Sequence, residues 1–270
     1  MQQLKPEQIV FCVALALFAV AVGVYLNAAA FSDADFLVLS DFFTVALSGL
    51  AFAALVFVCL ATKKTDDRRT GWALLAAGFG SWFAAEVVWA FYELVLGIET
   101  SVFSLADAFW WLGYFPMAAG MYFLSKTFFI HLSEAKKIVL AAATAAAVVA
   151  AMVLLGGVAA EASVPWQVVV SQAFYPLADL VLLALAAYIA LGTLEFTKFS
   201  RVFFVLAAAF VVWVVFDYWF AYAVFVGVYD PKQFYDVVYL LTYLLVAAAA
   251  ACRSCSLKNF FAKKVMVFLG

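Results

Sequence analysis

Apolar runs of about 20 residues follow one another along the whole chain, and they constrain its fold more than any other feature. Each run is long enough to cross a bilayer as a helix, which takes roughly 20 predominantly apolar residues. Hydrophobic residues make up 70% of the chain and charged residues 12%, whereas soluble domains average about 45–50% and 25%. We therefore predict an all-α, polytopic membrane protein.

Polar segments, or segments with glycine and proline, separate eight predicted transmembrane helices. Examples are SDAD, TKKTDDRRTG, HLSEAKK and VYDPKQ. The first apolar run lacks a strong basic flank and an A-x-A site, so we interpret it as a span and not as a cleaved signal. The eight predicted spans cover roughly residues 8–28, 36–62, 71–97, 105–130, 137–158, 164–195, 202–228 and 233–252.

Lysines and arginines are concentrated in alternate loops, which predicts the orientation in the membrane. They lie between spans 2 and 3, 4 and 5, and 6 and 7, and after span 8, whereas the other loops contain only Lys232. We therefore expect a multi-pass protein of the cell membrane with cytoplasmic N- and C-termini. A reagent applied from outside should label Thr100→Cys and spare Thr65→Cys. The net charge of −2 gives no reason to expect a nucleic-acid partner.

The two halves of the chain repeat one pattern of polar and aromatic residues. Four spans form each repeat, and because four is even, both copies should share one orientation about an axis along the membrane normal. We predict a first repeat at 1–131, a second at 132–253 and a short cytoplasmic tail at 254–270. At offsets of about 130 positions, Trp82, Glu86, Gly97, Asp107 and Tyr114 correspond to Trp213, Asp217, Gly227, Asp236 and Tyr243.

Acidic residues occur in the outer half or the middle of the predicted spans. An ionisable group at this depth costs roughly 2.5–3.5 kcal/mol on insertion scales and is a functional-site hypothesis by default. No lysine or arginine lies beside these acids within the spans, so they must be protonated, hydrogen-bonded or paired with an imported cation. The six acids are Asp41, Glu86, Asp107, Asp179, Asp217 and Asp236.

Aromatic residues share helix faces with several of these acids, because they lie three or four positions away. A carboxylate lined by Trp and Tyr rings can hold a cation by its charge and by the ring quadrupole together. The alternative is that the acids are protonated and bonded across helices, or that Asp107 and Asp236 are helix caps. The predicted aromatic site residues are Trp82, Trp89, Trp111, Tyr114, Trp213, Tyr239 and Tyr243.

Neither a cofactor, a metal site nor a catalytic residue is predicted. His131 is the single histidine, so it cannot provide two imidazole ligands for a haem, and we interpret it as a surface residue. Cys252 and Cys255 form one C-x-x-C pair, whereas a structural zinc site takes four ligands. With Cys12 and Cys59 they give no sign of a disulfide framework.

The first repeat contains G-W-x-L-x-A-x-G-x-x-x-W-x-x-x-E-x-x-W, a glycine, and then S-L-A-D-x-F-x-x-L-G-Y. Together with Tyr175-Pro176-Leu177-Ala178-Asp179 in the second repeat, it resembles the amino-terminal membrane region of many bacterial and archaeal signalling proteins. In those proteins GGDEF, EAL or histidine-kinase domains follow that region. The resemblance covers about residues 36–252 and implies a sensor-like membrane module. Only about 18 residues follow the last span, so we expect no output domain here.

Three classes of function fit these observations. The first is a sensory or ligand-binding module in the lipid bilayer that binds a small cationic ligand and signals through a cytoplasmic or membrane partner. The second is a secondary transporter of protons, cations or a small cationic solute, which two parallel repeats would suit. The third is an intramembrane lipid hydrolase with a carboxylate pair as acid and base. We favour the first class, and with it a protein that is not an enzyme.

Overall fold

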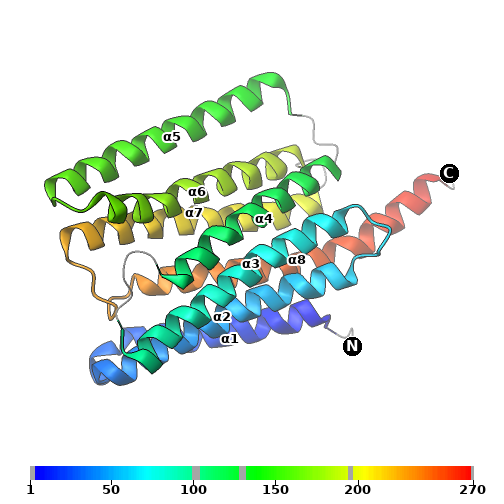
Figure 1. Ribbon diagram of the computed structural model, residues 1–270. Coiled ribbons are helices and arrows are strands. Elements are labelled where there is room, and N and C mark those ends of the chain that lie inside the picture. Colours follow the sequence, from blue (N-terminus) through cyan, green and yellow to red (C-terminus); the bar gives the residue numbers. More distant parts are fainter. Residues whose placement is uncertain (1–3, 99–103, 128–131, 194–196, 269–270) are drawn as a thin grey trace.

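The computed structural model describes residues 4–98, 104–127, 132–193 and 197–268, with residues 127, 197–200 and 254–268 described by their backbone only. Within this part the chain forms eight α-helices and no strand, which confirms the predicted all-α class (Figure 1). His131 and Glu99 lie outside the described residues. The helices are α1 (Pro6–Leu26), α2 (Asp33–Ala61), α3 (Arg68–Phe91), α4 (Leu105–Thr127), α5 (Glu134–Glu161), α6 (Trp166–Gly192), α7 (Thr197–Val226) and α8 (Asp236–Phe268).

Successive helices run in opposite directions, so the connections alternate between the two ends of the bundle (Figure 1). We call the end with the α1–α2, α3–α4, α5–α6 and α7–α8 connections the acidic end, and the opposite end the basic end. Both chain termini lie at the basic end. Helix α5 lies at the edge of the bundle, against α6 and α7, whereas α8 packs on α1, α2 and α7.

Seven of the helices are long and apolar enough to cross a membrane, and α4 is the helix that falls short within the described residues. Trp110, Trp111, Tyr114 and Pro116 lower its hydropathy, although α4 is packed between α3 and α6. Side chains that face protein need not be as apolar as side chains that face lipid. Seven spans are therefore supported by composition, and the eighth stays a prediction.

The ends of the helices follow local sequence signals. Ser32 precedes α2, and its hydroxyl accepts a hydrogen bond from the backbone N–H of Asp35 at 3.1 Å, as an N-cap residue does. Helix α3 ends in a π-helical turn, Tyr92–Leu96. Gly97 and Gly227, which follow the ends of α3 and α7, adopt positive φ angles of 62° and 69°, the left-handed conformation that favours glycine at a helix end.

Helices α3 and α4 cross closely because glycines face each other. A Cβ atom on Gly78 would lie 2.7 Å from the carbonyl oxygen of Gly113, and one on Gly113 would lie 2.8 Å from that of Gly78. About two helical turns further along, a Cβ atom on Gly120 would lie 2.8 Å from the carbonyl oxygen of Gly71. Small residues of this kind let membrane helices pack backbone to backbone. This crossing fixes α4, which carries several site residues, against α3.

Two buried tryptophans meet in the centre of the bundle and join the two halves of the chain. The rings of Trp82 and Trp213 lie edge to face, 4.6 Å apart between centroids and 90° apart in plane. Tyr114 packs against Trp82 at 5.0 Å, and Tyr243 packs against Trp213 at 5.4 Å, both edge to face. Each such aromatic pair adds about 0.5–1.5 kcal/mol beyond the area that it buries.

Helix α8 continues to Phe268, through the segment that the sequence analysis treats as a tail from residue 254. At about 1.5 Å per residue its 33 residues measure about 50 Å, which exceeds the roughly 30 Å of a bilayer core. The helix is therefore long enough to extend well beyond a membrane.

Candidate functional site

Glu86 of α3 is 3% exposed and accepts three hydrogen bonds on one carboxylate oxygen. Tyr243 donates at 2.5 Å, Trp110 donates through Nε1 at 3.2 Å, and the hydroxyl of Tyr239 is the third donor. The two tyrosine hydroxyls are also hydrogen-bonded to each other at 3.0 Å. None of the ion pairs in the described part of the chain includes Glu86.

The donors come from two other helices, α4 and α8. Tyr239 and Tyr243 lie four positions apart on α8 and therefore point to the same side. Trp110 comes from α4, which the glycine crossing holds against α3. A buried carboxyl without such donors would pay several kcal/mol for lost hydration, so these three bonds allow an acid to remain at this position.

Asp41 lies near Glu86 and also near a third acid, Glu93. Asp41 of α2 is 7% exposed and lies within hydrogen-bonding reach of Glu93 in the π-helical turn, and Glu86 acts on it electrostatically. Its buried Oδ2 atom has no hydrogen-bond partner in the described part of the chain. We call Asp41, Glu86, Glu93, Trp110, Tyr239 and Tyr243 the Glu86 cluster. Among the described residues, no group of His, Cys, Asp or Glu has a geometry that could hold a metal ion.

A second cluster joins α4, α6 and α7. Asp179 of α6 is 0% exposed, and its Oδ1 accepts a hydrogen bond of 2.9 Å from the hydroxyl of Tyr114 on α4. The carboxyl of Asp217, on α7, lies within hydrogen-bonding reach of Asp179. The Oδ2 atom of Asp179 has no donor in the described part of the chain. We call these three residues the Asp179 cluster.

The acids at the starts of α4 and α8 have different surroundings. Asp107 accepts from the backbone N–H and the hydroxyl of Ser104 at 2.9 and 2.7 Å, and its own N–H donates to that hydroxyl at 3.2 Å. This is a capping arrangement, to which the hydroxyl of Tyr175 on α6 adds one more bond. Asp236 accepts from the hydroxyl of Tyr229 at 3.0 Å, while its buried Oδ1 atom has no partner in the described residues.

The structure therefore divides the predicted site into separate groups. Trp82 and Trp213, with Tyr114 and Tyr243, form what we call the aromatic centre of the bundle. Trp82 donates from Nε1 to the carbonyl oxygen of Trp110 at 2.9 Å. Trp89 packs on Trp110 at 5.7 Å, beside the Glu86 cluster, and Trp111 packs on Phe174 at 4.7 Å.

Sequence reasoning missed Glu93, Trp110, Tyr175 and Tyr229 as partners of the acids. Tyr175 lies four positions before Asp179 on the same helix, but its hydroxyl bonds to Asp107 on α4, so this spacing would have indicated the wrong acid. Glu93 gave no comparable signal, since it lies near the predicted end of a span.

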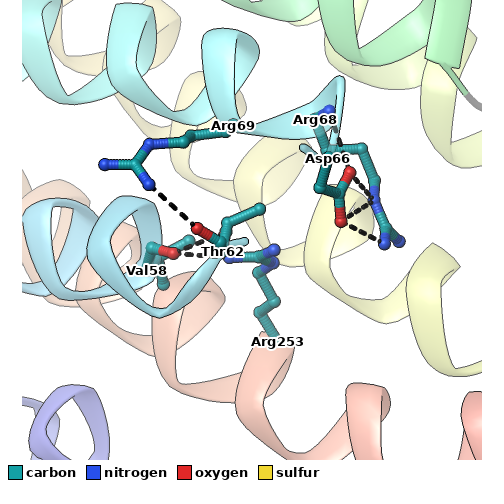
Figure 2. Close-up of polar contacts among 6 residues, drawn as sticks. All are labelled: Val58, Thr62, Asp66, Arg68, Arg69 and Arg253. Atoms are coloured by element: carbon teal, nitrogen blue, oxygen red, sulfur yellow. Dashed lines mark hydrogen bonds and ion pairs between the residues drawn. The ribbon is translucent and has the colours of Figure 1, made fainter. Parts of the chain in front are cut away.

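Arg253 lies at the basic end, and the structure buries it, whereas the sequence pattern treats it as one of the basic residues flanking a span. It is 2% exposed, its Nη1 atom donates to the carbonyl oxygen of Val58 at 2.7 Å, and its guanidinium lies 4.8 Å from the ring centroid of Trp72. Figure 2 shows the hydrogen bond from Arg253 to Val58 and the Arg68–Asp66 ion pair, which measures 2.6 Å. Hydrogen bonds from Arg68 hold the pKa of Asp66 below its ordinary value. Arg253 thus attaches α8 to α2 and α3.

Comparison of the chain with protein-family models, with curated proteins and with solved structures gave no match. The chemistry of the clusters is that of buried carboxyls held by phenol and indole donors. Such groups can bind and release a proton or hold a cation.

Proposed function

We propose that this chain is an integral membrane sensory module that binds a small organic cation in the Glu86 cluster. One observation carries the proposal: Glu86 is buried and held by phenol and indole donors, a second acid, Asp41, lies near it, and no basic side chain in the described part of the chain is bonded to it. Glu86 and Asp41 repel each other when both are ionised, so a cation beside Glu86 is stabilised. The rings of Trp110 and Tyr239 are half-buried and can add cation–π attraction.

The proposal includes two repeats related by an axis along the bundle. The aromatic centre supports it, since Trp82 with Tyr114 and Trp213 with Tyr243 are equivalent pairs and the two tryptophans touch each other. The helix contacts between the halves support it too, because α2 packs on α8 and α6 packs on α4. In each of these contacts, the second helix of one repeat packs on the fourth helix of the other.

Helix α8 is the element that would transmit binding to a signalling partner. It carries Tyr239 and Tyr243 in the Glu86 cluster, then Arg253 at the basic end, and it continues to Phe268. A cation that binds the Glu86 carboxylate would compete with the hydroxyls of Tyr239 and Tyr243, and would thereby change the position of both tyrosines and of α8. With the basic end in the cytoplasm, as the positive-inside rule predicts, the partner would meet this helix there.

The experiment measures binding of tetramethylammonium to the purified protein in nanodiscs through its tryptophan fluorescence. Glu86→Gln keeps the shape of the side chain and removes its charge. We expect this variant to bind the probe at least about 10-fold more weakly, because it lacks the carboxylate charge that attracts the cation. Glu134→Gln, an exposed acid at the start of α5, is the control and should bind like the wild type. Equal affinities for the wild type and Glu86→Gln would refute the proposal.

A transporter is the second candidate, because the Asp179 cluster places two carboxyls in the interior of the bundle between α6 and α7. Proteoliposomes with an imposed proton gradient separate the two functions. Uptake of labelled ammonium compounds driven by that gradient would favour transport, whereas saturable binding without uptake would favour the sensor.

A further inference from the structure

Asp179 and Asp217 form a pair of carboxyls in the interior of the bundle. Asp179 lies in the middle of α6 and is 0% exposed, α7 packs directly against α6, and the two carboxyls lie within hydrogen-bonding reach of each other. Ionised carboxylates only accept hydrogen bonds. Two carboxyls can therefore bond to each other only when one of them carries a proton.

The space around Asp179 decides which cation the pair can bind. The Oδ1 atom is occupied by the hydroxyl of Tyr114 at 2.9 Å. The Oδ2 atom is buried, exposes no surface that water could touch, and has no donor in the described part of the chain. Neither a hydrated metal ion nor an ammonium group fits such a position, whereas a proton needs no space of its own.

The groups that face the pair offer no opposite charge to replace that proton. Helix α4 contributes Tyr114 and, through Tyr175, Asp107, and α8 contributes Tyr243, on which Asp217 acts electrostatically. Helix α5 also packs on α6, but its charged residues lie near its two ends, at Glu134, Lys136, Lys137 and Glu161. The neighbours of the pair are thus phenols and another acid.

We propose that Asp179 and Asp217 share one proton and form a proton-binding site of this membrane protein. Asp217 is half-buried and is therefore the member of the pair through which the proton enters and leaves. Loss of the proton leaves two like charges side by side in the interior, which pushes α6 from α7. Tyr114 follows Asp179, and because it packs on Trp82, the aromatic centre moves with it. The inference does not depend on the Glu86 cluster or its ligand.

Infrared difference spectroscopy on the full chain in nanodiscs tests the site, with aspartate carrying ¹³C in its side-chain carboxyl so that glutamates are excluded. At neutral pH we expect the carbonyl band of a protonated aspartic acid, which shifts in D₂O and disappears at alkaline pH. Asp179→Asn and Asp217→Asn should each remove the same component of this band, because an amide N–H replaces the shared proton, whereas any component from Asp41 or Asp236 should remain. The double variant should remove no more than either single variant, since the pair holds one proton.

Two further variants keep the test decisive if an Asn variant does not fold. Tyr114→Phe removes the donor to Oδ1 and leaves the shared proton, so the band should keep its area and change its frequency. Asp66→Asn removes an ion-paired acid at the basic end and should leave the band unchanged. Absence of the band from the wild type, an unaltered frequency in Tyr114→Phe, or additive losses in the two Asn variants would overturn the proposal.

Discussion

Adding one methyl group to Gly78 tests the α3–α4 crossing. A Cβ atom there would lie 2.3 Å from Cγ of Met117 and 2.7 Å from the carbonyl oxygen of Gly113. The methionine side chain can turn away, but the carbonyl oxygen belongs to the backbone of α4. The two helices must therefore move apart by roughly half an ångström, and overpacking of this kind costs about 1–3 kcal/mol.

The sign of the effect separates packing from helix propensity. Alanine is favoured over glycine inside a helix by about 1 kcal/mol, so without the close contact Gly78→Ala would stabilise the protein. The structure offers a matched control in α5, where a Cβ atom on Gly156 meets nothing within 4 Å. We expect Gly78→Ala to destabilise the protein and Gly156→Ala to leave it unchanged or stabilise it.

Thermal unfolding of both variants in the same detergent measures the difference. The propensity gain of about 1 kcal/mol leaves a net cost of up to about 2 kcal/mol. For chains of about this size, 1 kcal/mol corresponds to a shift in Tm of about 2–4 °C, so Gly78→Ala should lower Tm by up to about 8 °C. Gly113→Ala should act in the same direction, because its Cβ atom would lie 2.4 Å from Cδ1 of Trp82. A Tm for Gly78→Ala at or above that of Gly156→Ala would refute the crossing as described.

Three further predictions concern the two ends of the bundle. The pKa of Asp66 is held below its ordinary value of 3.8, so its ion pair stabilises the fold above that pH and loses this effect as the pH falls through the lowered pKa. Asp66→Asn should therefore lower the free energy of unfolding by less than about 1 kcal/mol at neutral pH, since the pair is partly exposed. In strong acid the variant should match the wild type. In a cysteine-free background, an impermeant maleimide applied to cells should label Asp230→Cys and spare Thr65→Cys; the reverse pattern would refute the orientation. Arg253→Met should be tolerated, because the carbonyl oxygen of Val58 keeps its hydrogen bond of 2.7 Å from Thr62. In a Thr62→Val background the same substitution should cost about 1–3 kcal/mol of unfolding free energy, because that oxygen then loses both donors. Equal costs in the two backgrounds, read from Tm, would contradict this.

The helices were predictable from the sequence because long apolar runs leave a chain in lipid few alternatives to the helix. The lower hydropathy of α4 reflects its neighbours, since Trp110, Trp111 and Tyr114 all point to partners on other helices or pack on them. Hydropathy alone cannot distinguish a spanning helix that is packed among other helices from a helix that is too polar to span a membrane. Only the folded arrangement shows that α4 lies between α3 and α6.

The acids of the site were predictable one by one, and their partners were not. Spacing along a helix predicts which residues share a face, and it correctly placed Tyr239 beside Tyr243. It could not predict that both reach Glu86, because that contact joins residues more than 150 positions apart. For the same reason Trp82, which shares a helix with Glu86, directs its N–H to α4 and not to the acid.

The Glu86 and Asp179 clusters differ in the position of their second acid, and the proposed duplication accounts for this difference. Glu86 corresponds to Asp217 and Tyr243 to Tyr114, so each cluster keeps one acid and one tyrosine from equivalent positions. The second acid does not correspond, because Asp179 aligns with Ser48, which lies seven positions beyond Asp41 on α2.

Seven residues of helix place Asp179 about 10 Å deeper than the equivalent of Asp41. The Glu86 cluster includes the half-buried rings of Trp110 and Tyr239, which an organic cation can reach, whereas Asp179 is 0% exposed. Under the proposed duplication, a change in the depth of one acid is therefore enough to account for both proposals, a ligand site in the Glu86 cluster and a proton site at Asp179 and Asp217.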